Sequence, residues 1–288
     1  MLKLQTSVEI PAPGFDVGFG HSALMLGSCF ADSIGSIMIE CGLDVCVNPF
    51  GTLYNPASIA SAIKRLEEGR PFTEEECVEM GAGAGRICSF SHHTRFARKD
   101  CESFLENANR SLGEACAFWK RCDTLILTLG TSMVWRRADN GMAVANCLKR
   151  PAAEFTHDRL TPDQVSELLE SVIKMSSPRR IILSISPIRH LSSGAHDNSL
   201  SKASLLLGAN QAVHSYPDTF YFPSYEIVLD ELRDYRFYSE DMVHPSELAV
   251  KIIWERFVES FIPASEKGRL AENEKAARRA AHRQLSIL

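Results

Sequence analysis

The sequence predicts an α/β protein, a three-layer α/β/α sandwich around a mostly parallel sheet. Short apolar runs, of the kind that form strands buried on both faces, alternate along the chain with longer stretches of helical periodicity. Capping and turn residues separate the two kinds of segment. This alternation favours a parallel sheet covered by helices on both faces, with a ligand site beyond the carboxyl ends of the strands.

The first strand is predicted at residues 23–26, where Ala-Leu-Met-Leu forms a short apolar run. Phe30, Ile34 and Met38 follow at helical spacing, so the turn between strand and helix falls at Gly27-Ser28. Such a turn exposes the serine hydroxyl and directs the first backbone N–H groups of the helix at any negative charge that forms beside it. Ser28 is therefore a candidate nucleophile.

Four further strands and four helices continue the alternation. The strands are predicted at residues 44–48, 124–129, 180–185 and 220–222, and the helices at residues 57–68, 102–120, 162–176 and 198–214. The helix at 162–176 is marked by Thr161-Pro162-Asp163-Gln164, which combines an N-cap, a first-turn proline and a capping-box glutamine.

Two stretches interrupt the alternation. Residues 70–96 contain a glycine-rich run and a histidine pair, and we interpret them as an inserted flap. The glycines belong to no strand-to-helix phosphate fingerprint, so a flexible turn is favoured over a nucleotide loop. His92 and His93 are adjacent and hence on opposite faces of any strand, which argues against joint metal binding. Residues 134–149 should form a hairpin that turns at residues 139–141.

Polar or glycine residues follow the first four strands. They are Ser28, Gly51, Gly130 with Thr131, and the loop at residues 187–190. Because the carboxyl ends of parallel strands lie at one edge of a sheet, we expect these residues to meet at a single rim.

A serine hydroxyl is a poor nucleophile until a neighbouring base removes its proton. The segment from Asp241 to Pro245 supplies such a base, because the three-residue offset places Asp241 and His244 on the same side of one turn. The carboxylate can then fix the imidazole tautomer and stabilise the imidazolium. Pro245 suits the first position of a helix predicted at residues 246–262, which would leave His244 exposed just before it.

Besides Gly27-Ser28-Cys29-Phe30-Ala31, the chain contains several longer distinctive stretches. They are Asn48-Pro49-Phe50-Gly51-Thr52-Leu53-Tyr54-Asn55-Pro56, Leu129-Gly130-Thr131, Ser186-Pro187-Ile188-Arg189-His190, Phe222-Pro223-Ser224-Tyr225-Glu226, and Asp234-Tyr235-Arg236-Phe237-Tyr238 through His244-Pro245. Together these stretches resemble the GSCFA domain family, whose name is spelled by residues 27–31. The resemblance covers about residues 24–261. It implies an SGNH or GDSL-type hydrolase fold, which is flavodoxin-like, with Ser28 as nucleophile, His244 as general base and Asp241 as its orienting carboxylate.

The SGNH superfamily is named after a serine, a glycine, an asparagine and a histidine in separate blocks. Gly51 matches the second-block glycine, but residues 129–132 stand where the third-block Gly-x-Asn is expected. The resemblance therefore implies an oxyanion hole that contains Gly51 and Thr131, with Ser132 or Asn146 as alternative donors.

Four further residues are predicted to contact the substrate: His93, Arg189, His190 and Asn198. The resemblance places His93 beside the active site, whereas the other three lie in a long polar loop over the predicted rim. A surface position for His93, and loop-stabilising hydrogen bonds for the others, are the competing structural explanations.

Composition limits the class of protein. The chain has 288 residues, of which 45% are hydrophobic, so it can bury a large core, and we expect one domain over residues 1–265 with a charged helical tail at 266–288. A net charge of −5 and the absence of a basic stripe argue against a nucleic-acid partner. No apolar run approaches the roughly 20 residues that span a membrane, and no cofactor or metal site is expected.

The N-terminus and the cysteines together favour a cytoplasmic protein. Residues 1–10 alternate like an edge strand and lack the apolar core of a secretory signal. The nine cysteines are odd in number and form no Cys-x-x-Cys pair. We therefore expect reduced, mostly buried thiols rather than disulfides or metal ligands.

Three functional hypotheses follow. The first is a serine hydrolase that acts on a short-chain or acetyl ester, with a carbohydrate as one candidate alcohol and acyl transfer by the same site as an alternative. The second makes Cys29 the nucleophile, although its side chain is expected to point into the base of the helix. The third is a non-catalytic carbohydrate- or peptide-binding module on a degenerate hydrolase fold, motivated by the missing third-block asparagine. The oligomeric state is left open.

Overall fold

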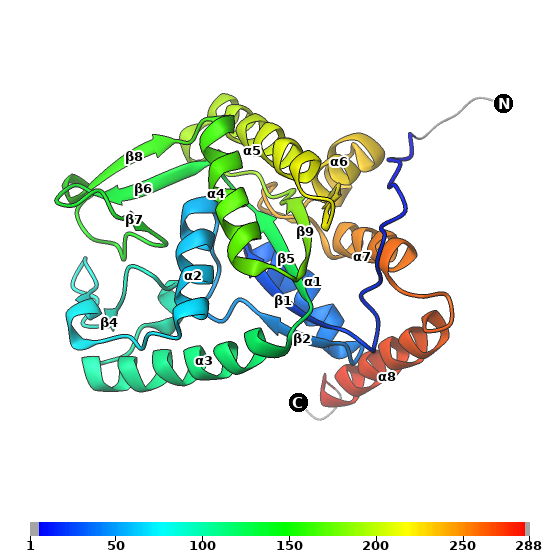
Figure 1. The fold of residues 1–288 in the computed structure, drawn as a ribbon, viewed down its shortest axis with the longest axis horizontal. Coiled ribbons are helices and arrows are strands. Elements are labelled where there is room, and N and C mark those ends of the chain that lie inside the picture. The colour runs from blue at the N-terminus through cyan, green and yellow to red at the C-terminus, as the bar shows by residue number, and fades with distance from the viewer. Residues whose placement is uncertain (1–5, 286–288) are drawn as a thin grey trace.

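A five-stranded parallel sheet forms the centre of the molecule, in a computed structural model that describes residues 6–285 (Figure 1). Its strand order is β10-β9-β5-β1-β2, and all four pairings are parallel. The strands are β1 (Ser22–Gly27), β2 (Asp44–Val47), β5 (Thr124–Leu129), β9 (Arg180–Ile185) and β10 (Thr219–Phe222). The predicted α/β sandwich with a mostly parallel sheet is confirmed.

Helices cover both faces of this sheet. One layer contains α2 (Pro56–Glu68), α3 (Cys101–Arg121), α4 (Pro162–Ser176) and α5 (Ala195–Ser215), and the other contains α1 (Cys29–Glu40), α7 (Glu247–Phe261) and α8 (Lys267–Leu285). The short α6 (Ser224–Glu226) follows β10. In Figure 1, α2 and α4 lie in front of the sheet and α1 behind it. Successive residues of β1 alternate between the two cores, with Leu24 and Leu26 in one and Ala23 and Met25 in the other. This two-sided burial explains the uninterrupted apolar runs.

The helix starts follow the capping residues. Thr161 and Gln164 form the predicted capping box at the start of α4. Ser246 caps α7 by accepting a hydrogen bond from the N–H of Ala249, so Pro245 lies one residue before the cap. The prediction that Pro245 occupies the first helical position was therefore wrong.

The predicted edge strand at residues 1–10 is not present where it can be tested. Residues 1–5 lie outside the described residues, and residues 6–10 form no strand. Instead, the N–H of Val8 donates to Glu231 at 2.9 Å, and its carbonyl accepts from Arg256.

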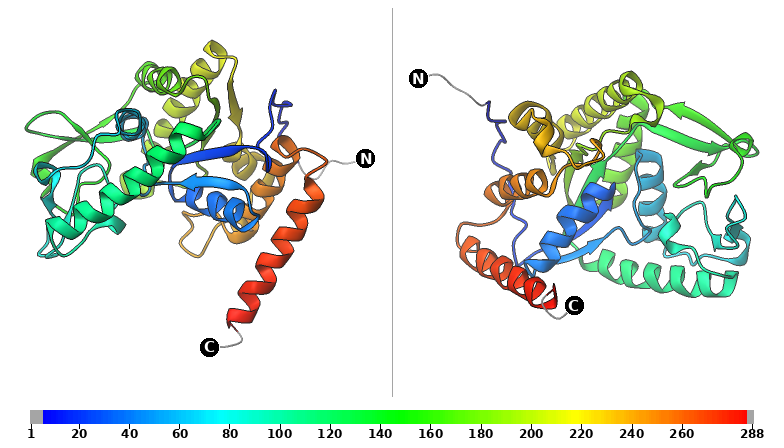
Figure 2. Two further views of the ribbon diagram at one scale, coloured as in Figure 1. Left: turned by 60° about the horizontal axis from the view of Figure 1, so that its bottom comes forward. Right: turned by 180° about the vertical axis from the view of Figure 1, so that it is seen from behind.

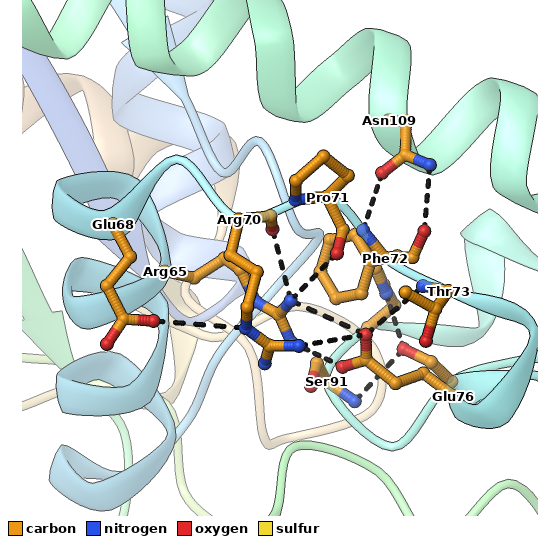
Figure 3. A network of polar contacts seen from close by, with 11 residues as sticks. Arg65, Glu68, Arg70, Pro71, Phe72, Thr73, Glu76, Ser91 and Asn109 are labelled. Atoms are coloured by element: carbon orange, nitrogen blue, oxygen red, sulfur yellow. Dashed lines mark hydrogen bonds and ion pairs between the residues drawn. The ribbon is translucent and has the colours of Figure 1, made fainter.

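The inserted flap contains the short strands β3 (Val78–Glu79) and β4 (Ile87–Cys88). Figure 3 shows how its first residues are anchored. The Arg65 guanidinium, on α2, donates to the carbonyl of Arg70 at 3.1 Å and forms an ion pair with Glu76. Asn109, on α3, makes two hydrogen bonds with the backbone of Phe72, of 2.7 and 3.0 Å.

A disulfide adds a covalent anchor to the flap. It joins Cys77 to Cys101, the first residue of α3. The expectation that every cysteine is reduced was therefore wrong, because two cysteines without a recognisable sequence pattern meet in space. The other seven cysteines are free.

A second, three-stranded sheet stands beside the central one. It consists of β6 (Met133–Arg137), β7 (Ala143–Val144) and β8 (Phe155–Arg159) in the order β7-β6-β8. The predicted hairpin corresponds to β6 and β7, whereas β8 was not predicted. In Figures 1 and 2 this sheet and the flap project on the same side of the molecule.

The last described element is α8, which extends away from the body of the molecule in the left view of Figure 2. The helix is tied to the core at its start, since Leu270 is buried and Asn273 donates to the carbonyl of Cys41 at 2.7 Å. Of the helices that the structure describes, none has the length and apolar character needed to cross a bilayer.

Candidate active site at the carboxyl edge of the sheet

The turn after β1 forms as the sequence predicts. A Cβ on Gly27 would lie only 2.4 Å from the carbonyl oxygen of Thr128, so this close approach of two strands requires glycine. The N–H of Ser28 donates to the same carbonyl at 3.2 Å, and α1 begins at the next residue. Ser28 thereby becomes the N-cap, and its Oγ accepts from the N–H of Phe30 at 3.3 Å.

Ser28 is fully buried beneath this turn. Its Oγ donates to the Oγ of Ser186, after β9, at 3.0 Å. Ser28 does not line the adjacent cavity, and no hydrogen bond joins it to His244 within residues 6–285. Its assignment as nucleophile stays a prediction. Its observed contacts are the N-cap hydrogen bond to α1 and the hydrogen bond to Ser186.

Cys29, by contrast, faces the cavity. Its Sγ lies 3.4 Å from Nε2 of His244, and both side chains line the same cavity, which has a volume of about 590 Å³. The expectation that Cys29 points into the helix base was wrong, because Ser28 already fills the inward cap position and the next side chain emerges at the surface of the turn.

His244 and Asp241 are paired as predicted. The Nδ1 atom of His244 lies 2.6 Å from Oδ2 of Asp241. The other carboxylate oxygen accepts hydrogen bonds of 2.9 Å from the N–H groups of Val243 and His244. These backbone hydrogen bonds and the imidazole lower the pKa of Asp241 to about 2. Asp241 is therefore ionised at neutral pH and fixes the ring, which leaves Nε2 toward the sulfur.

The thiol of Cys29 carries its proton at rest. Burial raises its pKa, whereas its own N–H and that of Phe30 act in the opposite direction, and the nearby carboxylate of Asp32 raises the pKa further. His244 would therefore have to remove the thiol proton during an attack, as a general base.

A protein-family model matches most of the chain. The model of the GSCFA family matches residues 22–257, which span β1, the Cys29 turn and the His244 loop. The chain belongs to the GSCFA family. The comparison with curated proteins finds none that matches. Membership is compatible with an enzyme of hydrolase-like fold.

The two predicted oxyanion donors of this GSCFA protein are engaged elsewhere. Gly51, at φ +82°, donates its N–H to the carbonyl of Asn48 at 2.8 Å. Thr131 donates its N–H to the carbonyl of Tyr54 at 2.9 Å, and its hydroxyl lies 2.9 Å from that of Ser201. Thr131 lines the cavity and Gly51 does not.

Of the four predicted substrate contacts, the structure places two on the cavity. His190 and Asn198 line it, and Oδ1 of Asn198 accepts from the N–H of His190 at 2.9 Å. Burial is the main cause that lowers the pKa of His190, to about 4, so its ring is neutral. Arg189 and His93 do not line the cavity. His93 packs against Gly51 instead, so closely that a Cβ on Gly51 would lie 2.4 Å from the Cβ of His93.

Lys202 of the GSCFA protein is a site residue that sequence reasoning missed. Lys202 is buried, and its Nζ donates to the carbonyls of Gly130 and Ser186, each at 2.6 Å. Desolvation, with a smaller effect of Arg189, lowers its pKa to about 7. The sequence did contain one indication of this burial. Lys202 lies three residues before Leu205, so the two share the buried face of the helix.

Asn48 was also missed as a positioning residue. Its Oδ1 accepts from the N–H of Gly27 at 2.9 Å, and its Nδ2 donates to Asp32 at 2.7 Å. The carbonyl of Asn48 accepts from Arg95 at 2.8 Å, which links the flap to the turn at Ser28 and Cys29. The buried amide therefore holds the residue just before the cap.

The far wall of the cavity belongs to the three-stranded sheet. Trp135 on β6 and His157 on β8 are direct cross-strand partners, and their rings stack with centroids 3.9 Å apart and an interplanar angle of 11°. Both line the cavity. Within residues 6–285, no group of three or more His, Cys, Asp or Glu residues is placed to hold a metal ion.

Proposed function

We propose that this GSCFA protein is an acyl-ester hydrolase whose nucleophile is Cys29. The observation that carries the proposal is the 3.4 Å contact between Sγ of Cys29 and Nε2 of His244, at the edge of a cavity that Ser28 does not reach. In this proposal Cys29 is the nucleophile, His244 is the base and Asp241 orients the imidazole. This is the arrangement of a catalytic triad.

The reaction would proceed through a thioester. As Sγ of Cys29 bonds to the ester carbonyl carbon, the π electron pair moves to the carbonyl oxygen and His244 takes the thiol proton. The N-terminal end of α1, whose dipole favours negative charge, would stabilise this oxyanion. Collapse of the intermediate breaks the bond to the alcohol, which leaves with the proton from His244.

Water completes the cycle in the hydrolase. It attacks the thioester while His244 accepts its proton, and the acid leaves as the thiol is restored. An alcohol in place of water would make the same residues an O-acyltransferase. A short acyl group, such as acetyl, is the preferred substrate, because the cavity of about 590 Å³ must also hold the alcohol.

Two adjacent variants test this proposal. The purified protein is incubated with p-nitrophenyl acetate, and the burst, the steady state and the acylated peptide are measured. Cys29→Ala should lose the adduct and lower turnover about 10³-fold or more, whereas Ser28→Ala keeps the adduct on Cys29. Cys116→Ala, which removes another partly buried free thiol, is the matched control.

The opposite pattern would reject the cysteine mechanism. An adduct on Ser28, with full turnover in Cys29→Ala, would restore the serine hydrolase. Absence of both adduct and turnover with acetyl and butyryl esters would favour the binding module.

A further inference from the structure

We propose that the Trp135–His157 stack is a binding platform for a sugar ring, which makes an acylated carbohydrate the substrate class. The proposal rests on the ester chemistry proposed at Cys29, because it assigns the alcohol component of that ester. It adds a recognition site on a separate sheet to the catalytic residues.

The platform is accessible and held in place. The Trp135 side chain is 38% exposed, although the other two tryptophans, Trp119 and Trp254, are 2% exposed. Its ring stacks on His157 and meets the buried Phe155 edge-on, with centroids 6.4 Å apart. Burial lowers the pKa of His157, so the stacked imidazole is neutral at neutral pH. A large aromatic face that is ordered without a ligand loses little entropy on binding.

The platform shares its cavity with the nucleophile. Trp135 and His157 line the same cavity as Cys29 and His244. Trp135 also lines a second cavity, of about 370 Å³. An ester carbonyl at Cys29 would therefore have its alcohol component within the reach of the stack.

Polar groups in the cavity favour a sugar over a purely apolar alcohol. Ser192, Ser193 and Asp197 line it from the segment around the start of α5. No hydrogen bond or ion pair with another residue of the 6–285 range engages their side-chain oxygens. A lipid or aryl alcohol would desolvate the Asp197 carboxylate without a compensating donor, which is costly. Sugar hydroxyls would donate to it while the C–H face of the ring lies on the indole.

Binding can be tested apart from catalysis. In the Cys29→Ala protein, methyl glucoside, methyl galactoside and methyl xyloside are titrated while acrylamide quenching of tryptophan fluorescence is followed. Because Trp135 is the accessible tryptophan among the three, at least one glycoside should reduce quenching, and Trp135→Phe should abolish the change. Quenching that none of the three sugars alters would overturn the proposal.

Turnover then tests the substrate class. Acid release is measured with methyl 6-O-acetylglucoside, phenyl acetate and ethyl acetate. Trp135→Ala should raise KM about tenfold more for the sugar ester than for ethyl acetate or phenyl acetate. Tyr235→Ala removes an aromatic ring that is 79% exposed outside the cavity, and serves as control.

Two outcomes separate this inference from the proposed function. An equal rise in KM for phenyl acetate and the sugar ester, or a rise for neither, would overturn the sugar platform even if Cys29→Ala is inactive. Full turnover in Cys29→Ala would reject the cysteine mechanism, while protection of Trp135 by a glycoside would still stand.

Discussion

At the scale of single residues, two neighbouring nucleophiles have opposite environments. Ser28 is buried and hydrogen-bonded to Ser186, whereas Cys29 contacts His244 at the edge of a cavity. The position of the turn could be predicted from the sequence, but not which of the two side chains is buried. The hydrogen-bond partner of Ser28 in the interior, Ser186, is 158 residues away in the sequence. The Asp241–His244 pair could be predicted because its geometry is local to one turn.

Loss of the Ser28 hydroxyl should affect stability more than chemistry. Ser28→Ala removes the N-cap of α1 and the hydrogen bond to Ser186, so the free energy of unfolding should fall by about 1–2 kcal/mol. Urea unfolding measures this change. Ser33→Ala, which removes an exposed hydroxyl from the same helix, should cost less. An unchanged free energy of unfolding in Ser28→Ala would contradict the cap assignment.

Asp241→Asn should retain the fold and lose most of the activity. The amide cannot stabilise the imidazolium or enforce the tautomer with Nε2 free, so kcat should fall about 10³-fold or more. Steady-state kinetics measure the effect, with Glu240→Gln as a control that removes a neighbouring exposed carboxylate. Equal kcat values in the two variants would remove Asp241 from the mechanism.

At the scale of elements, the strands and helices that could be predicted were those with a clear local sequence pattern. The observed bounds of β5 and β9 coincide with the predicted ones, since both are apolar runs buried on both faces. The strand β8 was missed because most of its residues are polar and at least partly exposed, so neither alternation nor an apolar run marks it. Lys202, which joins the ends of β5 and β9, was missed because its two carbonyl acceptors are set by tertiary structure.

The buried Lys202, which bonds to the carbonyls of Gly130 and Ser186, should make the free energy of unfolding depend on pH. Its pKa is lowered from 10.5 to about 7 in the fold, so the unfolded state binds more protons between these values. Stability attributable to Lys202 should therefore rise as the pH increases from about 7 to 10.5. The difference in unfolding free energy between the wild type and Lys202→Met is measured at several pH values. A difference that stays constant over this window would refute the prediction.

At the scale of the whole molecule, the flap is fixed to the body by contacts from separate elements. The Arg65–Glu76 ion pair holds it to α2, and Asn109 and the Cys77–Cys101 disulfide hold it to α3. The sequence predicted an inserted flap with a flexible glycine turn, but not its anchors, because these depend on distant side chains that no local pattern relates. The flap also contacts the segment that holds the Ser28–Cys29 turn, through Arg95 and Asn48.

Breaking the disulfide should lower stability and spare the chemistry. The double variant Cys77→Ser with Cys101→Ser removes the cross-link, so the free energy of unfolding should fall by about 2–4 kcal/mol. Turnover should change little, because neither cysteine lines the catalytic cavity. Denaturant unfolding and steady-state assays check both parts. A loss of turnover in a folded double variant would show that the flap controls the site.

The separate three-stranded sheet has a consequence for how such a protein diversifies. Cys29 and His244, the proposed nucleophile and base, lie at the start of α1 and in the segment before α7, whereas the aromatic wall is carried by β6 and β8, within residues 133–159. Exchanging this one continuous stretch between relatives would exchange the wall and leave the reactive groups in place. The proposed selectivity and the proposed reactivity would thus be encoded in separate segments of the gene, so that one could change while the other is kept.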